Sequence, residues 1–126
     1  MISKNIFEIR EAKFSDYVDI SRLASSANFR LSPRQIEIYL KDEGTKTTVL
    51  SFSDGLAGFA TSGSFVSGEI TLKNIFISPP LRRQGFAGKM LSENLSYWKE
   101  KGALKCLLEL RSSNESARKF YTNYAT

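Results

Sequence analysis

The sequence predicts one layered domain of the α/β or α+β class over residues 1–126, with its elements in the order β-αα-βββ-α-β-α. A chain of 126 residues is long enough for one compact domain and too short for two. Hydrophobic residues make up 41% and charged residues 25%, as is typical of globular proteins. Apolar residues alternate with polar ones in some segments and recur every three or four residues in others, which indicates strands and helices together.

The beginning of the chain predicts a strand followed by two helices. Residues 7–13 begin with apolar and polar residues in alternation, as in a half-buried strand. Ser15 is a candidate N-cap for a helix over about residues 16–26. Ser32, followed by proline, begins a second helix that Gly44 ends.

The remaining segments predict a three-stranded meander, a helix, a strand and a last helix. Residues 47–53 are β-branched and apolar, and the Asp54-Gly55 pair that follows is a strong hairpin signal. The strand over residues 69–77 ends with apolar residues on both faces, which indicates a well-covered position in the sheet. The other elements are a strand over residues 56–65, a helix over residues 85–101, a buried strand over residues 104–110 and a helix over residues 114–124.

The amino-acid composition excludes several kinds of chemistry. The chain has no histidine and a single cysteine, Cys106, which rules out Ser-His-Asp and Cys-His nucleophilic systems, His-rich zinc sites and an internal disulfide. We therefore expect no metal, and acid–base chemistry that uses Glu, Asp, Tyr, Lys or water. The single cysteine and the lack of a long apolar segment or signal peptide predict a cytoplasmic protein without membrane contact. The net charge of +5 is compatible with an anionic ligand or an acidic partner.

A basic segment containing glycine joins the third meander strand to the next helix. Free amides at a helix N-terminus, together with the helix dipole, make an anion site. Gly85 lets the backbone approach a phosphate, while Arg82 and Arg83 add positive charge. The segment is neither a Walker loop nor a dinucleotide fingerprint, because the lysine of the first and the further glycines of the second are missing. A positively charged helix start without a ligand is the alternative interpretation.

Two motifs resemble one enzyme family. The motif Arg82-x-x-Gly85-x-Ala87 after a strand resembles the pyrophosphate motif of GNAT acetyltransferases. Residues 108–114, Leu-Glu-Leu-Arg-Ser-Ser-Asn, are followed by Ala117 and Phe120-Tyr121. This order resembles the RimI-type ribosomal-protein alanine N-acetyltransferases, in which a Leu-Glu-Val-Arg-x-Ser-Asn stretch precedes Ala and then Leu-Tyr. The resemblance covers residues 69–124 and implies a mixed, mostly antiparallel central sheet flanked by helices, with acetyl-CoA as co-substrate.

The resemblance also implies roles for individual residues. Glu109 becomes the general base, Tyr121 the general acid, and Asn114 a hydrogen-bond partner of the pantetheine arm. Each also has a structural interpretation: Glu109 as a charged residue at a strand end, Tyr121 as core, and Asn114 as a helix N-cap. The other implied contacts are the backbone of Ile75, Phe76 and Ile77 with the pantetheine arm, and Arg82, Arg83, Gln84, Gly85, Phe86, Ala87 and Gly88 with the pyrophosphate.

The implied reaction is acetyl transfer from acetyl-CoA to a primary amine, with the N-terminal α-amine of a protein, such as a ribosomal protein, as the expected acceptor. The alternatives are a GNAT enzyme for a small amine or a lysine side chain, and a CoA-binding module without catalysis. A further alternative, a nucleic-acid-binding domain, is supported only by the net charge and two arginines. The family usually continues beyond the position of Tyr124 into a terminal β-hairpin, so we expect a shortened domain that lacks it. The strand over residues 104–110 is then an exposed edge through which a homodimer could form.

Overall fold

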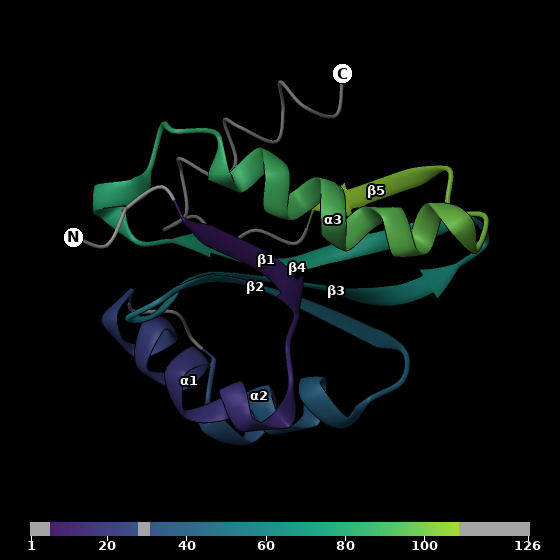
Figure 1. Cartoon of the computed structure of the whole chain (residues 1–126). Coiled ribbons are helices and arrows are strands. Elements are labelled where there is room, and N and C mark those ends of the chain that lie inside the picture. The colour runs from purple at the N-terminus through teal and green to yellow at the C-terminus, as the bar shows by residue number, and fades with distance from the viewer. Residues whose placement is uncertain (1–5, 28–30, 109–126) are drawn as a thin grey trace.

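In the computed structural model of the chain, which describes residues 6–27 and 31–108, one five-stranded sheet lies between helices on both of its faces (Figure 1). The helices α1 and α2 cover one face and α3 covers the other. This confirms the predicted fold class and the order β-αα-βββ-α-β; the predicted helix over residues 114–124 lies outside the described residues. The elements are β1 (Phe7–Glu11), α1 (Tyr17–Ser26), α2 (Pro33–Lys41), β2 (Thr45–Phe52), β3 (Gly55–Val66), β4 (Glu69–Ile77), α3 (Phe86–Glu100) and β5 (Lys105–Leu108), with the 3-10 turns η1 (Phe14–Asp16) and η2 (Pro79–Leu81).

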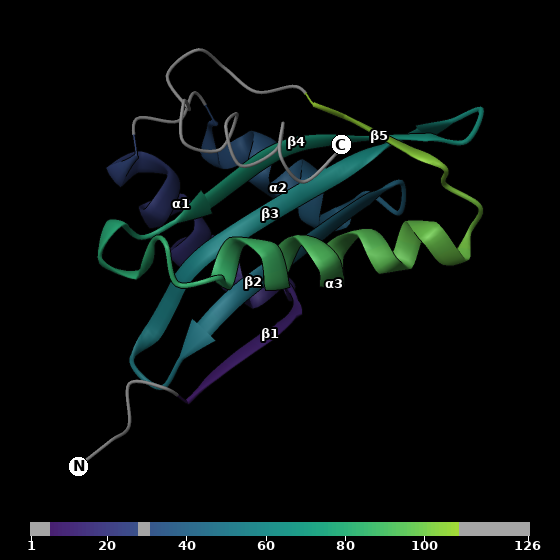
Figure 2. The same ribbon diagram turned by 90° about the horizontal axis from the view of Figure 1, so that it is seen from above.

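The strands follow one another in the order β1-β2-β3-β4-β5, and Figure 2 shows α3 lying across them. The first four strands pair antiparallel, while β5 returns parallel to β4 because α3 carries the chain back across the sheet. The hairpin between β2 and β3 forms as predicted, but its turn comes one residue early. Phe52 pairs with Gly55, so that Ser53 and Asp54 make the turn.

A β-bulge interrupts the ladder between β3 and β4. Thr61 pairs with Asn74, whereas Ser62 pairs with Leu72, so Lys73 is an extra residue on β4. Over the described residues, β4 and β5 pair in parallel from Glu69 and Lys105 to Leu72 and Leu108. Residues 73–77 continue β4 from the bulge towards the loop that precedes α3.

Each face of the sheet carries its own hydrophobic core. Alternation along the strands places Leu50 and Ala60 against α3, and Val49 and Phe59 against α1 and α2. The end of β4 is buried on both faces, as predicted from its apolar run. The buried residues of α3 are Phe86, Met90, Leu91, Asn94, Leu95 and Trp98. Among residues 6–27 and 31–108, no helix is both long and apolar enough to cross a membrane.

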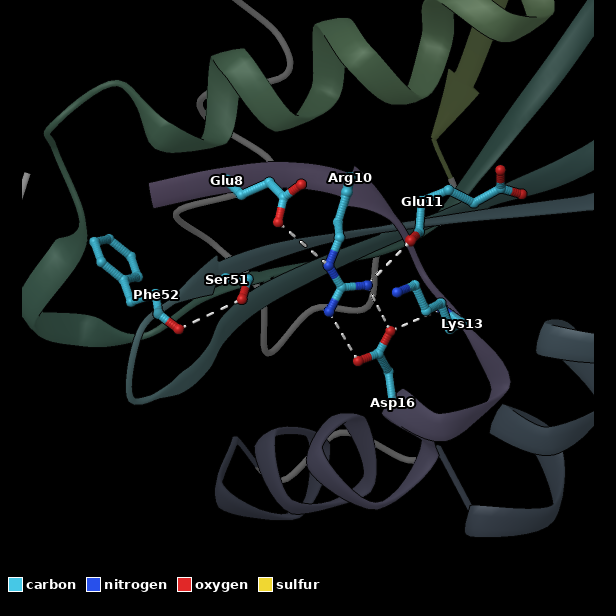
Figure 3. Close-up of polar contacts among 7 residues, drawn as sticks. All are labelled: Glu8, Arg10, Glu11, Lys13, Asp16, Ser51 and Phe52. Atoms are coloured by element: carbon cyan, nitrogen blue, oxygen red, sulfur yellow. Dashed lines mark hydrogen bonds and ion pairs between the residues drawn. The ribbon is translucent and has the colours of Figure 1, made fainter. Parts of the chain in front are cut away.

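The start of α1 differs from the sequence-based expectation. The 3-10 turn η1 precedes the helix, and Ser15 lies within this turn instead of capping α1. The carboxylate of Asp16 accepts a hydrogen bond from the backbone N–H of Lys13 at 2.7 Å and two from the Arg10 guanidinium at 2.8 and 3.1 Å (Figure 3). The hydrogen bond from Arg10 lowers the pKa of Asp16, although burial opposes that shift. The contact between Arg10 of β1 and Asp16, six residues later, therefore organises the start of the helix.

Candidate functional site

The loop between β4 and α3 has the backbone shape of an anion site. Gly85 is the N-cap of α3, and its carbonyl accepts the first helical hydrogen bond, from the N–H of Lys89 at 3.2 Å. The amides of Phe86, Ala87 and Gly88 form the first turn, where N–H groups have no acceptor within a helix. Between Ser78 and Gly88 the sequence contains no carboxylate. An anion in front of this turn therefore meets the positive end of α3 without nearby repulsion from the loop.

Gly85 is needed for its backbone conformation, not for its packing. Its φ is 85°, in the left-handed region that residues with a side chain adopt at a cost. Apart from the two neighbouring residues, no atom of the described part of the chain lies within 4 Å of a Cβ built on Gly85. The space over this glycine is therefore open, and a ligand can approach the backbone there.

The two arginines of the loop have different surroundings. Arg82 donates from Nε to the carbonyl of Ile77 at 2.8 Å, and its guanidinium lies 5.5 Å from the centre of the Phe76 ring. Arg82 thus ties the loop to the end of β4, besides adding the expected positive charge. Arg83 has a left-handed φ of 64°, and its exposed side chain has no hydrogen bond or ion pair with the described part of the chain.

Sequence reasoning missed a third basic residue beside the loop. Lys89 is exposed and, with Gly85 and Gly88, borders a hollow of about 740 Å³ between β1 and the start of α3. Its ammonium lies 5.1 Å from the centre of the Phe7 ring. A lysine in the first turns of a helix is electrostatically unfavourable, because it faces the positive end of the dipole. That mismatch was the signal in the sequence that could have drawn attention to Lys89.

The predicted pantetheine-binding strand leads directly into this loop. The side chains of Ile75, Phe76 and Ile77 are buried in the two cores, at 4%, 6% and 6% exposure. Their side chains therefore serve packing, and any contact with a ligand falls to the backbone. One edge of this segment pairs with β3, and the described part of β5 pairs with residues 69–72 of β4, before the segment begins. The structure thus brings the two predicted cofactor segments together, joined by the Arg82–Ile77 hydrogen bond.

The three remaining site residues, Glu109, Asn114 and Tyr121, lie outside the described residues. The described part of β5 ends at Leu108, next to Glu109 in sequence. Among residues 6–27 and 31–108, no group of three or more His, Cys, Asp or Glu side chains is placed to hold a metal ion.

A model of the acetyltransferase (GNAT) family matches residues 5–124 of the chain. The chain belongs to the GNAT family. This confirms the resemblance drawn from the Arg82-x-x-Gly85-x-Ala87 motif and from residues 108–114. In this GNAT chain, the end of β4, the left-handed Gly85 and the first turn of α3 follow one another without a break.

Individual relatives agree with this assignment. The chain is 31% identical over 84 residues to the ribosomal protein bS18-alanine N-acetyltransferase of Haemophilus ducreyi. That match covers 65% of this chain and 57% of the relative, so it spans little more than half of the relative's length.

Solved structures share the fold at low sequence identity. A ribosomal-protein-alanine N-acetyltransferase from Brucella melitensis biovar Abortus 2308 superimposes with a TM-score of 0.81 at 18% identity, covering 96% of this chain and 92% of that one. The aminoglycoside N-acetyltransferase AAC(6')-Iy in complex with CoA superimposes with a TM-score of 0.79 at 15% identity, covering 98% and 90%.

Proposed function

We propose that the chain transfers an acetyl group from acetyl-CoA to a primary amine, and that this amine is the N-terminal α-amine of a protein such as a ribosomal protein. The observation that carries the reaction class is the first turn of α3, whose amides have no acceptor within the helix, in a chain that belongs to the GNAT family. The acceptor is supported by the names of the relative from H. ducreyi and of the Brucella structure.

The described residues fit the anionic and the amide-rich parts of CoA. The amides of residues 83–88 bind the pyrophosphate, and the arginines at 82 and 83 supply charge. The backbone of residues 75–77 pairs with the pantetheine arm as an added strand would. The co-substrate supplies an activated thioester when bound. The open space over Gly85 supports this placement, because a phosphate needs close approach to the backbone.

The chemistry requires a neutral amine and a proton for the departing thiolate. An α-amine titrates at about 7.7–8.0, so a weak base that acts directly or through water is sufficient near neutral pH. We assign that role to Glu109, which takes the proton from the attacking nitrogen. The new C–N bond then replaces the C–S bond, and Tyr121 donates its hydroxyl proton to the sulfur. A phenol near pKa 10 can protonate a thiolate whose thiol titrates near about 8.5, with a modest driving force.

A peptide panel tests this function. Purified protein is incubated with acetyl-CoA and one acceptor at a time, and free thiol is measured as it is released. We expect release with peptides that carry a free N-terminal alanine, and none with the same peptides after N-terminal blocking. Release with blocked peptides that contain lysine, or with a small amine such as an aminoglycoside, would contradict the proposed acceptor. Binding of CoA without turnover on any acceptor would indicate a binding module.

We also propose that a second copy of the chain can pair at β5. Over the described residues β5 ends the sheet, and its neighbourhood exposes three leucines. Leu104 is 92% exposed, Leu107 43% and Leu108 38%. A strand edge with exposed apolar side chains favours pairing with another chain.

A further inference from the structure

A buried polar cluster lies in the apolar core between α3 and the sheet. Asn94 and Ser62 are both 0% exposed, and Thr48 is 3% exposed. Asn94 projects from the third turn of α3, while the other two belong to β3 and β2. The spacing of the apolar residues in this helix gives no sign that Asn94 is buried.

The hydrogen bonds of Asn94 hold α3 to two strands at once. Its side-chain amide lies within donating distance of three acceptors, namely the Lys46 carbonyl at 3.2 Å, the Thr48 hydroxyl at 3.0 Å and the Ala60 carbonyl at 3.3 Å. Its carbonyl oxygen accepts from the Ser62 hydroxyl. Ser62 in turn accepts from the indole N–H of Trp98 at 2.8 Å, one turn further along α3. Every polar group of this cluster therefore has a partner.

The cluster lies beside the register shift between β3 and β4. Ser62 stands at the register shift between β3 and β4, and its partner across the ladder is Leu72. Leu72 also pairs with Leu108, the final described residue of β5. From this level onwards, residues 73–77 of β4 run towards the loop that begins α3. The contacts of Asn94 and Trp98 thus join α3 to the point that directs the end of β4.

Hydrophobic packing alone does not fix the position of a helix along its own axis, because it has no direction and tolerates small shifts. A buried carboxamide does fix it, since any shift leaves polar groups without partners in a medium where that is costly. The cluster therefore selects one position of α3, and with it one position of the amides at its N-terminus.

We propose that Asn94 is a positioning residue for CoA. By holding α3 against β2 and β3, it sets the distance between the pyrophosphate amides at the start of α3 and the pantetheine-binding backbone of residues 75–77. The affinity of a ligand that spans both places depends on the distance between them. The affinity of a fragment that occupies only one of them does not. This inference rests on the proposed function, because it takes CoA as the ligand.

The test compares CoA with its two parts. In Asn94→Leu, which keeps a branched side chain but removes its polar atoms, we expect CoA affinity measured by calorimetry to fall on the order of 10- to 100-fold, as a small misplacement costs. ADP and pantetheine alone should bind as they do to the wild type, because each half-site stays intact. Ser62→Ala removes one hydrogen-bond link and should give a smaller loss of the same kind. If Asn94→Leu does not fold, the CoA affinity of Ser62→Ala decides the test. The control is Ser96→Ala, since the exposed Ser96 hydroxyl of α3 bonds only the carbonyl of Glu93 among the described residues.

Two results would overturn the positioning role. One is unchanged CoA affinity in both folded variants. The other is an equal loss for CoA and ADP, which would mean general damage to the start of α3. The wild type separates this inference from the function on which it rests. A wild type that binds no CoA overturns both, whereas a wild type that binds CoA while the variants match it overturns the positioning role alone.

Discussion

Two glycines at opposite ends of α3 separate backbone strain from ligand contact. Gly85 and Gly102 both have a positive φ, 85° and 101°, and neither would place a Cβ within 4 Å of another atom. Valine at either position should therefore cost a similar free energy of unfolding, roughly 1–2 kcal/mol for the left-handed conformation. Only Gly85→Val should weaken CoA binding by tenfold or more, because only Gly85 faces the proposed pyrophosphate. Calorimetry with CoA on both variants checks this, and an equal affinity in the two would remove the loop from the site.

Glu109 and Tyr121 make opposite predictions in pH–rate profiles. Glu109→Gln should lower kcat by about 10²–10⁴, as is typical when a general base is lost. Raising the pH should partly restore its rate, since more of the amine is then neutral without help. Tyr121→Phe keeps the ring and removes the proton donor, so its rate should fall without recovery at high pH.

The control for this pair is Glu100→Gln, which changes an exposed glutamate at the end of α3. It should leave kcat and the pH profile unchanged. CoA binding should survive in both Glu109→Gln and Tyr121→Phe, because the loop of α3 is untouched. If both variants lose CoA binding, the residues are structural. If both keep full activity on a competent peptide, their assigned roles are wrong.

At the scale of the elements, the Arg10–Asp16 ion pair connects β1 to the start of α1. Asp16 is 7% exposed and accepts three hydrogen bonds, so Asp16→Asn should lower the free energy of unfolding by about 2 kcal/mol at pH 7. The pKa of Asp16 is lowered from its ordinary value of 3.8. A lowered folded-state pKa means that the carboxylate stabilises the fold above pH 3.8, and that this contribution disappears as the pH falls through the folded-state pKa.

The difference between wild type and Asp16→Asn should therefore shrink in acid, as measured by urea unfolding across pH. Asp19→Asn is the control, because the Asp19–Arg22 ion pair is exposed, with side-chain exposures of 44% and 73%. Its effect should stay below about 0.5 kcal/mol at any pH. A constant difference for Asp16→Asn down to the lowest pH would show that its charge does not stabilise the fold.

At the scale of the whole molecule, the exposed leucines at β5 predict self-association. Light scattering should show a mass above that of the 126-residue chain as the concentration rises. Leu107→Lys should restore the monomer, because a charge on a strand edge opposes pairing. Val66→Lys is the control: it changes a side chain that is 66% exposed at the end of β3, and should leave association unaltered. A monomer at all concentrations in the wild type would contradict pairing at β5.

The order of the elements and the glycine-containing loop before α3 could be predicted because the signals for them are local. Ser32 does cap α2, accepting from the N–H of Gln35 at 3.1 Å, as the Ser-Pro pair indicated. The β-branched and apolar residues of β2 and the apolar end of β4 are likewise signals carried by neighbours in the chain. The conformation of Gly85 is also a local effect, because glycine adopts a left-handed φ more easily than other residues.

Tertiary structure decided what depends on contacts between elements. Ser15 was the expected cap of α1, but the Asp16 carboxylate and the guanidinium of Arg10, six residues earlier in β1, organise that start instead. In the sequence, Asn94 resembles any polar helix residue. In the folded chain, the strands place Ser62, Thr48 and the Lys46 carbonyl around it. Local pattern shows where a chain can turn, coil or extend, because backbone sterics and hydrophobic periodicity act over a few residues. The free energy that a buried polar group contributes depends on its hydrogen-bond partners, and only folding brings those partners together.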